Sequence, residues 1–138
     1  MNPETGRQMY AGELEVELVP QGTLCERIRS AGAGLGGVLT PTGIGTEVEK
    51  GKQIININGR DFLLELPLRG DVALIYGSKV DKAGNIAFNG TTRNTNVVMA
   101  TAADIVIVEA EEFIDGYLDP NEVVIPSLFI DYIVIKEK

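Results

Sequence analysis

The chain has 138 residues, of which 44% are hydrophobic and 23% are charged, so length and composition fit one globular domain and not a disordered tail. The formal net charge of −8 argues against partners that are themselves negative, namely nucleic acid and anionic membrane surfaces. One cysteine, Cys25, and no histidine exclude an internal disulfide and a Cys/His metal site. Residues 1–10 lack the apolar core of a signal peptide, and no apolar run approaches the roughly 20 residues that span a bilayer, so we expect a cytoplasmic protein.

The first third of the chain predicts one strand followed by one helix. Residues 13–19 alternate polar and apolar side chains with a period of two, which is typical of a half-buried strand that ends at Pro20. Thr23 and Glu26 have the spacing of a capping box, so Thr23 is the predicted cap of the helix. We expect that helix to stop within the glycine-rich residues 30–37.

The rest of the chain predicts a hairpin and several buried strands. Residues 53–57 and 62–66 flank Asn58-Gly59, the dipeptide that best favours a type I′ turn. Almost continuously apolar runs, which suit parallel strands buried on both faces, occur at residues 72–76, 105–108 and 130–135. Residues 96–103 are expected to form a helix that joins two of these strands. The pattern therefore predicts a mixed α/β fold with an attached antiparallel hairpin.

No catalytic nucleophile can be named from the residues alone. Without histidine, neither a Ser-His-Asp nor a Cys-His arrangement can exist within the chain, and Cys25 is interpreted as structural. The acidic residues fall on exposed strand faces or in the patch 109–112, which we interpret as solvated surface. No two carboxylates stand out as an acid/base pair.

The segment from Gly32 to Gly37 is the most unusual stretch of the sequence. It meets the spacing G-x-G-x-x-G, but it follows a predicted helix and not a strand, which argues against a dinucleotide site. Two interpretations stay open. The glycines can stop the helix in a tight turn, or their backbone N–H groups can face an anionic ligand.

Gln21 is the other candidate for a binding role. It lies where the predicted strand ends and the helix begins, and ligands of open α/β sheets bind at the carboxyl ends of strands. Its side-chain amide can donate a hydrogen bond to a carbonyl oxygen that gains negative charge during a reaction. A simple turn or capping role is the alternative interpretation of a glutamine at this position.

Taken in order, several segments resemble the α subunits of family I CoA-transferases. They are residues 11–24 with Glu26-Arg27-Ile28-Arg29, Gly32-Ala33-Gly34, Thr40-Pro41-Thr42-Gly43, Asp81 with Gly84-Asn85, and Arg93-Asn94 with Asn96. The resemblance covers essentially the whole chain, and Gly34 to Leu39 are most similar to the bacterial acetate/acetoacetate type. It implies a three-layer α/β fold, with a mixed sheet, helices on both faces and a β-hairpin, of the kind shared with sugar-phosphate isomerases.

The same resemblance implies an activity, which is transfer of CoA between a short-chain acyl-CoA and a free carboxylate such as acetate or acetoacetate. In the family, a glutamate of the β subunit within a Ser-Glu-Asn-Gly segment attacks the thioester, and a glutamyl-CoA intermediate forms. That segment does not occur here, so the nucleophile is expected on a partner β subunit in a hetero-oligomer. The CoA thioester is expected as a substrate, with no permanently bound cofactor and no metal.

The resemblance also implies roles for individual residues and indicates which part of an α subunit this chain corresponds to. Gln21 is implied to bind the acyl oxygen or oxyanion, and Gly32, Ala33 and Gly34 to border the substrate pocket. Residues 1–138 are interpreted as the C-terminal portion of an α subunit in a single domain, because family α subunits carry a Gly-Gly-Phe segment and the first strands of the sheet ahead of the matching region. The alternatives are a non-catalytic metabolite-binding module or an inactive truncated subunit of the same fold.

Overall fold

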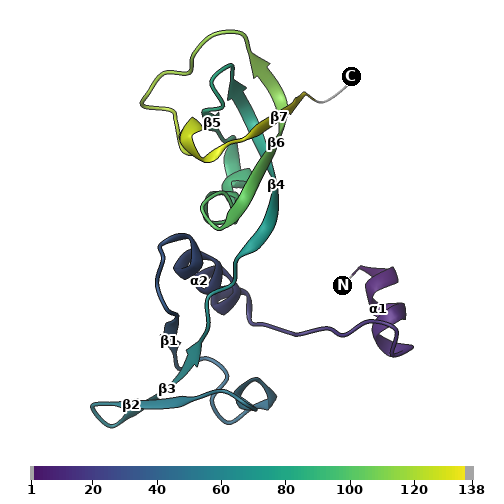
Figure 1. Cartoon of the computed structure of the whole chain (residues 1–138), viewed down its shortest axis with the longest axis vertical. Helices are drawn as coiled ribbons and strands as arrows, with labels where there is room; N and C mark the ends of the chain where they lie inside the picture. The colour runs from purple at the N-terminus through teal and green to yellow at the C-terminus, as the bar shows by residue number, and fades with distance from the viewer. Residues whose placement is uncertain (1, 136–138) are drawn as a thin grey trace.

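The computed structural model describes residues 2–135 and has two separate sheets at opposite ends of an elongated molecule (Figure 1). The helices are α1 (Pro3–Tyr10), α2 (Gln21–Gly32) and α3 (Asn96–Met99), with short 3-10 helices η1 (Glu47–Glu49), η2 (Gly90–Arg93) and η3 (Ser127–Phe129). The strands are β1 (Val38–Thr40), β2 (Ile54–Ile57), β3 (Arg60–Glu65), β4 (Gly70–Asp81), β5 (Ile86–Ala87), β6 (Ala103–Ile114) and β7 (Tyr132–Ile135). None of the helices in this part of the chain is long and apolar enough to cross a membrane.

The larger sheet has the strand order β5-β4-β6-β7 and contains the main core. β4 pairs with β6 in parallel over 12-residue strands, β6 pairs with β7 in parallel, and β5 is antiparallel to β4. One face of this sheet is buried, because alternate side chains such as Ile75 and Val108 pack against Ile86, Ile125 and the residues around α3 and η3. The predicted apolar runs at residues 72–76 and 105–108 are therefore confirmed as strands, and the run at 130–135 forms a strand from Tyr132 onward.

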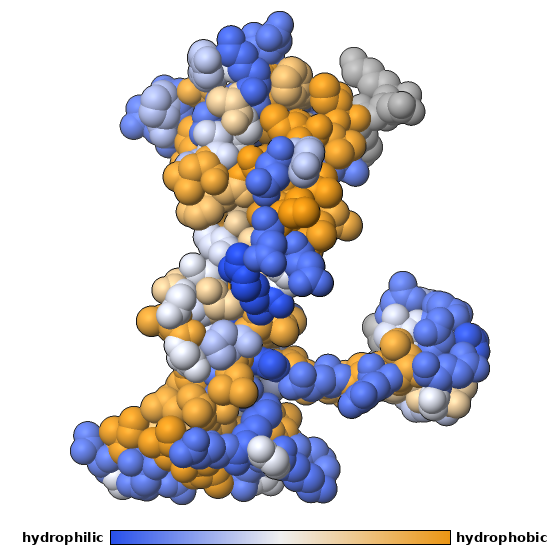
Figure 2. Space-filling model, in the orientation of Figure 1, coloured by the Kyte–Doolittle hydropathy of each residue, from blue (hydrophilic) through white to orange (hydrophobic). Residues whose placement is uncertain are grey.

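The opposite face of the same sheet stays exposed. Val72, Leu74, Ile105 and Val134 lie on it with exposed fractions of 50%, 70%, 40% and 49%, and we call these four residues the open face. Figure 2 shows hydrophobic residues gathered on the side that β4, β6 and β7 form. Parallel sheets are normally covered on both faces. Within residues 2–135, the expected burial holds for one face only.

The smaller sheet is antiparallel, with the strand order β1-β3-β2. β2 and β3 form the predicted hairpin, in which Ile57 pairs with Arg60 across a two-residue turn. Asn58 and Gly59 have φ values of 52° and 79°, as a type I′ turn requires, so this prediction is confirmed.

Helix α2 lies between the two sheets (Figure 1). Arg27 fixes it to the connection between β3 and β4, because its Nε donates to Leu66 O at 3.0 Å and its carbonyl accepts from Leu68 N at 3.0 Å. The Arg27 side chain is only 12% exposed and also pairs with Glu17 at 3.0 Å. At the far end of α2, Gly32 packs closely against Thr101 beside α3. α2 thus contacts both halves of the molecule.

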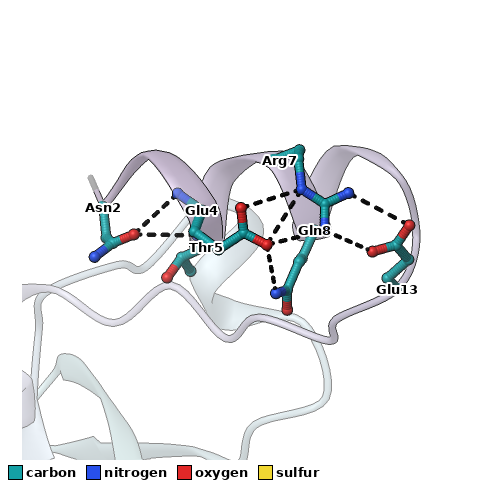
Figure 3. Close-up of polar contacts among 6 residues, drawn as sticks. All are labelled: Asn2, Glu4, Thr5, Arg7, Gln8 and Glu13. Atoms are coloured by element: carbon teal, nitrogen blue, oxygen red, sulfur yellow. Dashed lines mark hydrogen bonds and ion pairs between the residues drawn. The ribbon is translucent and has the colours of Figure 1, made fainter.

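The N-terminal residues form an arm that extends away from the sheets (Figure 1). Asn2 caps α1 by accepting from Glu4 N at 2.9 Å, and Arg7 pairs with both Glu4 and Glu13 (Figure 3). The strand predicted at residues 13–19 is wrong. The segment is extended but pairs with no other strand among the described residues, and Leu18 is 69% exposed. Alternation in sequence makes a strand only where a neighbour supplies hydrogen bonds.

Two further predictions are corrected at helix boundaries. Thr23 does not cap α2, because the helix begins earlier, at Gln21, and Pro20 occupies the N-cap position. The helix predicted over residues 96–103 ends at Met99, because Ala103 already pairs with Gly70 as the first residue of β6. In both places tertiary pairing or backbone geometry overrode a local pattern.

Candidate functional site

The start of α2 carries backbone donors that no protein group satisfies. Pro20 at the N-cap position provides no side-chain acceptor, and the first hydrogen bond of the helix runs from Leu24 N to Pro20 O at 2.9 Å. The N–H groups of Gln21, Gly22 and Thr23 precede that bond and donate to no acceptor in residues 2–135. Such groups, together with the positive end of the helix dipole, favour a negatively charged oxygen.

Gln21 is exposed at this same position, as the first residue of α2. Among residues 2–135, its Nε2 has one hydrogen-bond partner, the sulfur of Cys25, one turn along the helix at 3.7 Å. A thiol is a weak acceptor, so little energy holds the amide in place and it is free to donate to a ligand. The structure therefore places Gln21 after an unpaired extended segment and not, as predicted, at the end of a sheet strand.

A groove with a volume of about 580 Å³ lies beside Gln21, between α2 and β1. Its walls include Gly22, Thr23 and Glu26 from α2 and Val38, Leu39 and Thr40 from β1. Neither Gln21 nor any lysine or arginine is part of this lining. Glu26, the acidic residue in it, pairs with Arg29 on the same helix at 3.2 Å.

The glycine candidates lie at the other end of α2. Gly32 is its last residue, and Gly34, with φ of 68°, accommodates the turn in which Leu35 N donates to Ser30 O at 2.8 Å. A Cβ at Gly32 would lie 2.2 Å from Thr101 Oγ1, so close packing also requires glycine there. Ala33 is the exposed C-cap residue. Along a helix of this length the two ends are about 16 Å apart, so the structure does not bring Gln21 and these residues together.

The other family-like residues hold the loops that follow β4. Asp81 is fully buried and accepts from the N–H groups of Ala83, Asn85 and Leu118 and from Asn85 Nδ2, at 2.9–3.0 Å. Burial alone raises the pKa of Asp81, but these hydrogen bonds outweigh it and hold the pKa below its ordinary value. Asn96 accepts from Tyr76 N and donates to Thr92 O. The side chains of Asp81, Asn85 and Asn96 are thus bonded to protein groups and shape the fold.

The family model described as coenzyme A transferase matches residues 1–136 of this sequence. The chain belongs to the coenzyme A transferase family. Over 134 residues it is 58% identical to an acetoacetyl-CoA:acetate/butyrate CoA transferase alpha subunit of Clostridium acetobutylicum, covering 96% of this chain and 62% of that protein. Over 138 residues it is 51% identical to the acetate CoA-transferase subunit alpha of Escherichia coli K12, covering 99% of this chain and 63% of that protein.

A solved structure shares the fold of this CoA-transferase chain. It is an acyl-CoA transferase from Escherichia coli O157:H7, in a thioester complex with CoA, which superposes with a TM-score of 0.83 at 22% identity over 97% of this chain and 32% of that one. This chain spans less than two thirds of the length of each of the two α-subunit relatives named above.

Sequence reasoning missed one polar residue of this CoA-transferase chain. Thr23 lines the groove beside α2, yet the capping-box spacing assigned its hydroxyl to the helix. The signal that could have corrected the assignment is Pro20, because proline is common at the beginning of a helix, where its missing N–H leaves no bond unmade, and this places the helix start next to Pro20 and ahead of Thr23. The acidic patch at residues 109–112 is largely exposed on β6, as predicted.

Proposed function

We propose that this chain provides the acyl-oxygen-binding part of an enzyme that transfers CoA between a short-chain acyl-CoA and a free carboxylate such as acetate or acetoacetate. The observation that carries the proposal is the exposed Gln21 amide beside three open backbone N–H groups. It occurs in a chain that is more than half identical, over nearly its whole length, to CoA-transferase α subunits. That level of identity favours the transferase over a non-catalytic module of the same fold.

The reaction needs a carboxylate nucleophile, which we assign to a glutamate of a partner β subunit. Its oxygen attacks the thioester carbonyl, the C–S bond breaks, and CoA leaves as the thiolate while an acyl-glutamyl anhydride forms. The thiolate then attacks the glutamyl carbonyl, which releases the acyl group as a free carboxylate and leaves glutamyl-CoA. The reverse steps with the acceptor acid complete the exchange. Gln21 would donate to the carbonyl oxygen as it becomes negatively charged.

The roles of Gly32, Ala33 and Gly34 at the border of the substrate pocket stay a prediction. Their place at the opposite end of α2 means that only an extended ligand would reach from them to Gln21. The hetero-oligomer with a β subunit and the cytoplasmic location are likewise predictions from the sequence.

The test is an assay of CoA exchange between acetyl-CoA and acetoacetate. It uses this chain alone, with a purified β subunit of a relative, and with that β subunit plus the part of the relative's α subunit that this chain does not match. Exchange that depends on the β subunit in either combination supports the proposal. Exchange by this chain alone would contradict the assignment of the nucleophile, and no exchange in any combination would overturn the function.

A further inference from the structure

The groove between α2 and β1 is lined by Thr23, a largely buried residue whose hydroxyl has no hydrogen-bond partner among residues 2–135. Thr23 is only 5% exposed, and its side chain makes no hydrogen bond with any residue from 2 to 135. In the same range, no fully enclosed side-chain nitrogen or oxygen lacks a partner. The Thr23 hydroxyl is therefore not fully enclosed, and the space it borders is the groove that Thr23 lines. An unpartnered hydroxyl in such a position indicates a ligand that can bond to it.

The groups around this hydroxyl favour a monoanion. The open N–H groups of Gly22 and Thr23 lie at the same helix start, where the dipole adds partial positive charge. Among residues 2–135, no lysine or arginine lines the groove, and Glu26 does, so a dianion such as phosphate would lack a counter-charge there and be repelled. Val38 and Leu39 of β1 also line the groove, so it has apolar residues as well as polar ones. A carboxylate with a short apolar tail fits this combination.

We propose that Thr23, together with the open N–H groups of Gly22 and Thr23, binds the carboxylate of the short-chain acid that exchanges CoA. The inference rests on the proposed function, because it names the site of that reaction's acid. It separates two tasks at the start of α2. The Gln21 amide faces the oxygen of the acyl group during transfer, and Thr23 holds the free acid before and after it.

The experiment measures acetate binding by the chain itself, without a β subunit. The ¹⁵N-labelled chain is titrated with sodium acetate, and with sodium chloride and sodium sulfate at equal ionic strength, while backbone amide shifts are followed. Saturable shifts at Gly22 and Thr23 with acetate, and much weaker ones with the other two salts, are expected. Equal binding of sulfate would mean a general anion site and would overturn the proposal, as would the absence of a saturable shift.

Substitutions make the test specific for the hydroxyl. Thr23→Val keeps the side-chain volume and removes the oxygen, so the Kd for acetate should rise about tenfold or more. Thr23→Ser keeps the hydroxyl, so its Kd for acetate should stay within about threefold of the wild-type value. This variant still tests the role of the hydroxyl if the valine variant fails to fold. Thr91→Val, at an exposed site in η2, is the matched control. Unchanged acetate affinity in Thr23→Val would overturn the inference, even if CoA exchange with the β subunit is observed. Acetate binding by the wild-type chain without CoA exchange in any combination would instead count against the proposed function.

Discussion

Gln21 has an exposed side chain that, within the part of the chain the structure describes, makes a hydrogen-bond contact with Cys25 alone, at 3.7 Å. Gln21→Ala should therefore leave folding almost unchanged, while turnover in the CoA-exchange assay with the β subunit should fall about 10²–10³-fold, the usual cost of losing one oxyanion donor. The matched control is Gln53→Ala, an exposed glutamine outside the groove beside α2. Near-normal turnover of Gln21→Ala would remove Gln21 from the site.

Asp81 carries a different prediction, which concerns stability and pH. Its carboxylate accepts four hydrogen bonds in a buried position, so Asp81→Ala should lower the free energy of unfolding by about 3–5 kcal/mol at pH 7. Urea denaturation measures this, with the exposed Asp115→Ala as a control expected within about 0.5 kcal/mol of the wild type.

The pH dependence follows from the sign of the Asp81 shift. The pKa of this carboxyl is lower in the folded chain than its ordinary value, so its stabilising contribution is complete above the unfolded pKa of about 3.9 and is lost as the pH falls through the folded pKa. The difference between wild type and Asp81→Ala should therefore shrink below about pH 4. A difference that stays constant from pH 7 to pH 3 would contradict this account.

At the scale of the elements, we expect Arg27 to hold α2 against the connection between β3 and β4, and so to fix the two halves of the molecule relative to each other. Arg27→Ala removes the bonds from a largely buried guanidinium to Leu66 O and Glu17, and because hydrogen bonds to charged groups contribute more than neutral ones, we expect a loss of about 1–3 kcal/mol. Faster hydrogen exchange at the Leu68 amide should accompany it. Arg29→Ala is the control, because Arg29 lies on the same helix with an exposed partner, Glu26, and should cost less than about 1 kcal/mol. Equal losses for both variants would exclude the linking role.

The elements that could be predicted from sequence are those decided by local chemistry. Asn58-Gly59 specifies its own turn through positive φ, and the apolar runs of β4 and β6 remain strands wherever they pack. The alternating residues 13–19 were misread because a strand also needs a neighbour, which no local pattern reveals. At the candidate site, Gln21 could be proposed from its position at the start of a helix, but the groove wall contributed by β1 depends on tertiary packing.

At the scale of the whole molecule, the accessible surface is larger than a compact fold of this size has. It measures 8983 Å², whereas a compact monomer of 14.9 kDa has about 7000 Å². The excess is on the order of what a permanent protein interface buries. The open face contributes to it with residues that are apolar and lie on neighbouring strands. A polypeptide that covers this face would complete the second layer that a parallel sheet normally has.

We expect that covering polypeptide to be the part of the related α subunits that this chain does not match, which is more than a third of their length. That segment of the Escherichia coli relative, co-expressed with this chain, should co-elute with it in gel filtration. Leu74→Glu should weaken the association at least tenfold, because it places a charge in the apolar face, yet should leave the isolated chain folded because Leu74 is 70% exposed.

The control for this prediction is Leu128→Glu, which is equally exposed but lies in η3, outside the open face. It should bind the segment like the wild type. If Leu74→Glu co-elutes with the segment as the wild type does, or if the segment never co-elutes, the segment does not cover the open face.

The parallel pairing of β4 with β6 also has a consequence for the time at which the chain folds. Gly70 pairs with Ala103, so β4 leaves the ribosome well before the strand that it needs has been made. At a synthesis rate of about 5–20 residues per second, β4 remains without β6 for a time on the order of seconds, with its apolar side chains exposed. Pairing across such a long loop is also intrinsically slow. The nascent chain should therefore need a chaperone during this interval, more than its modest size suggests.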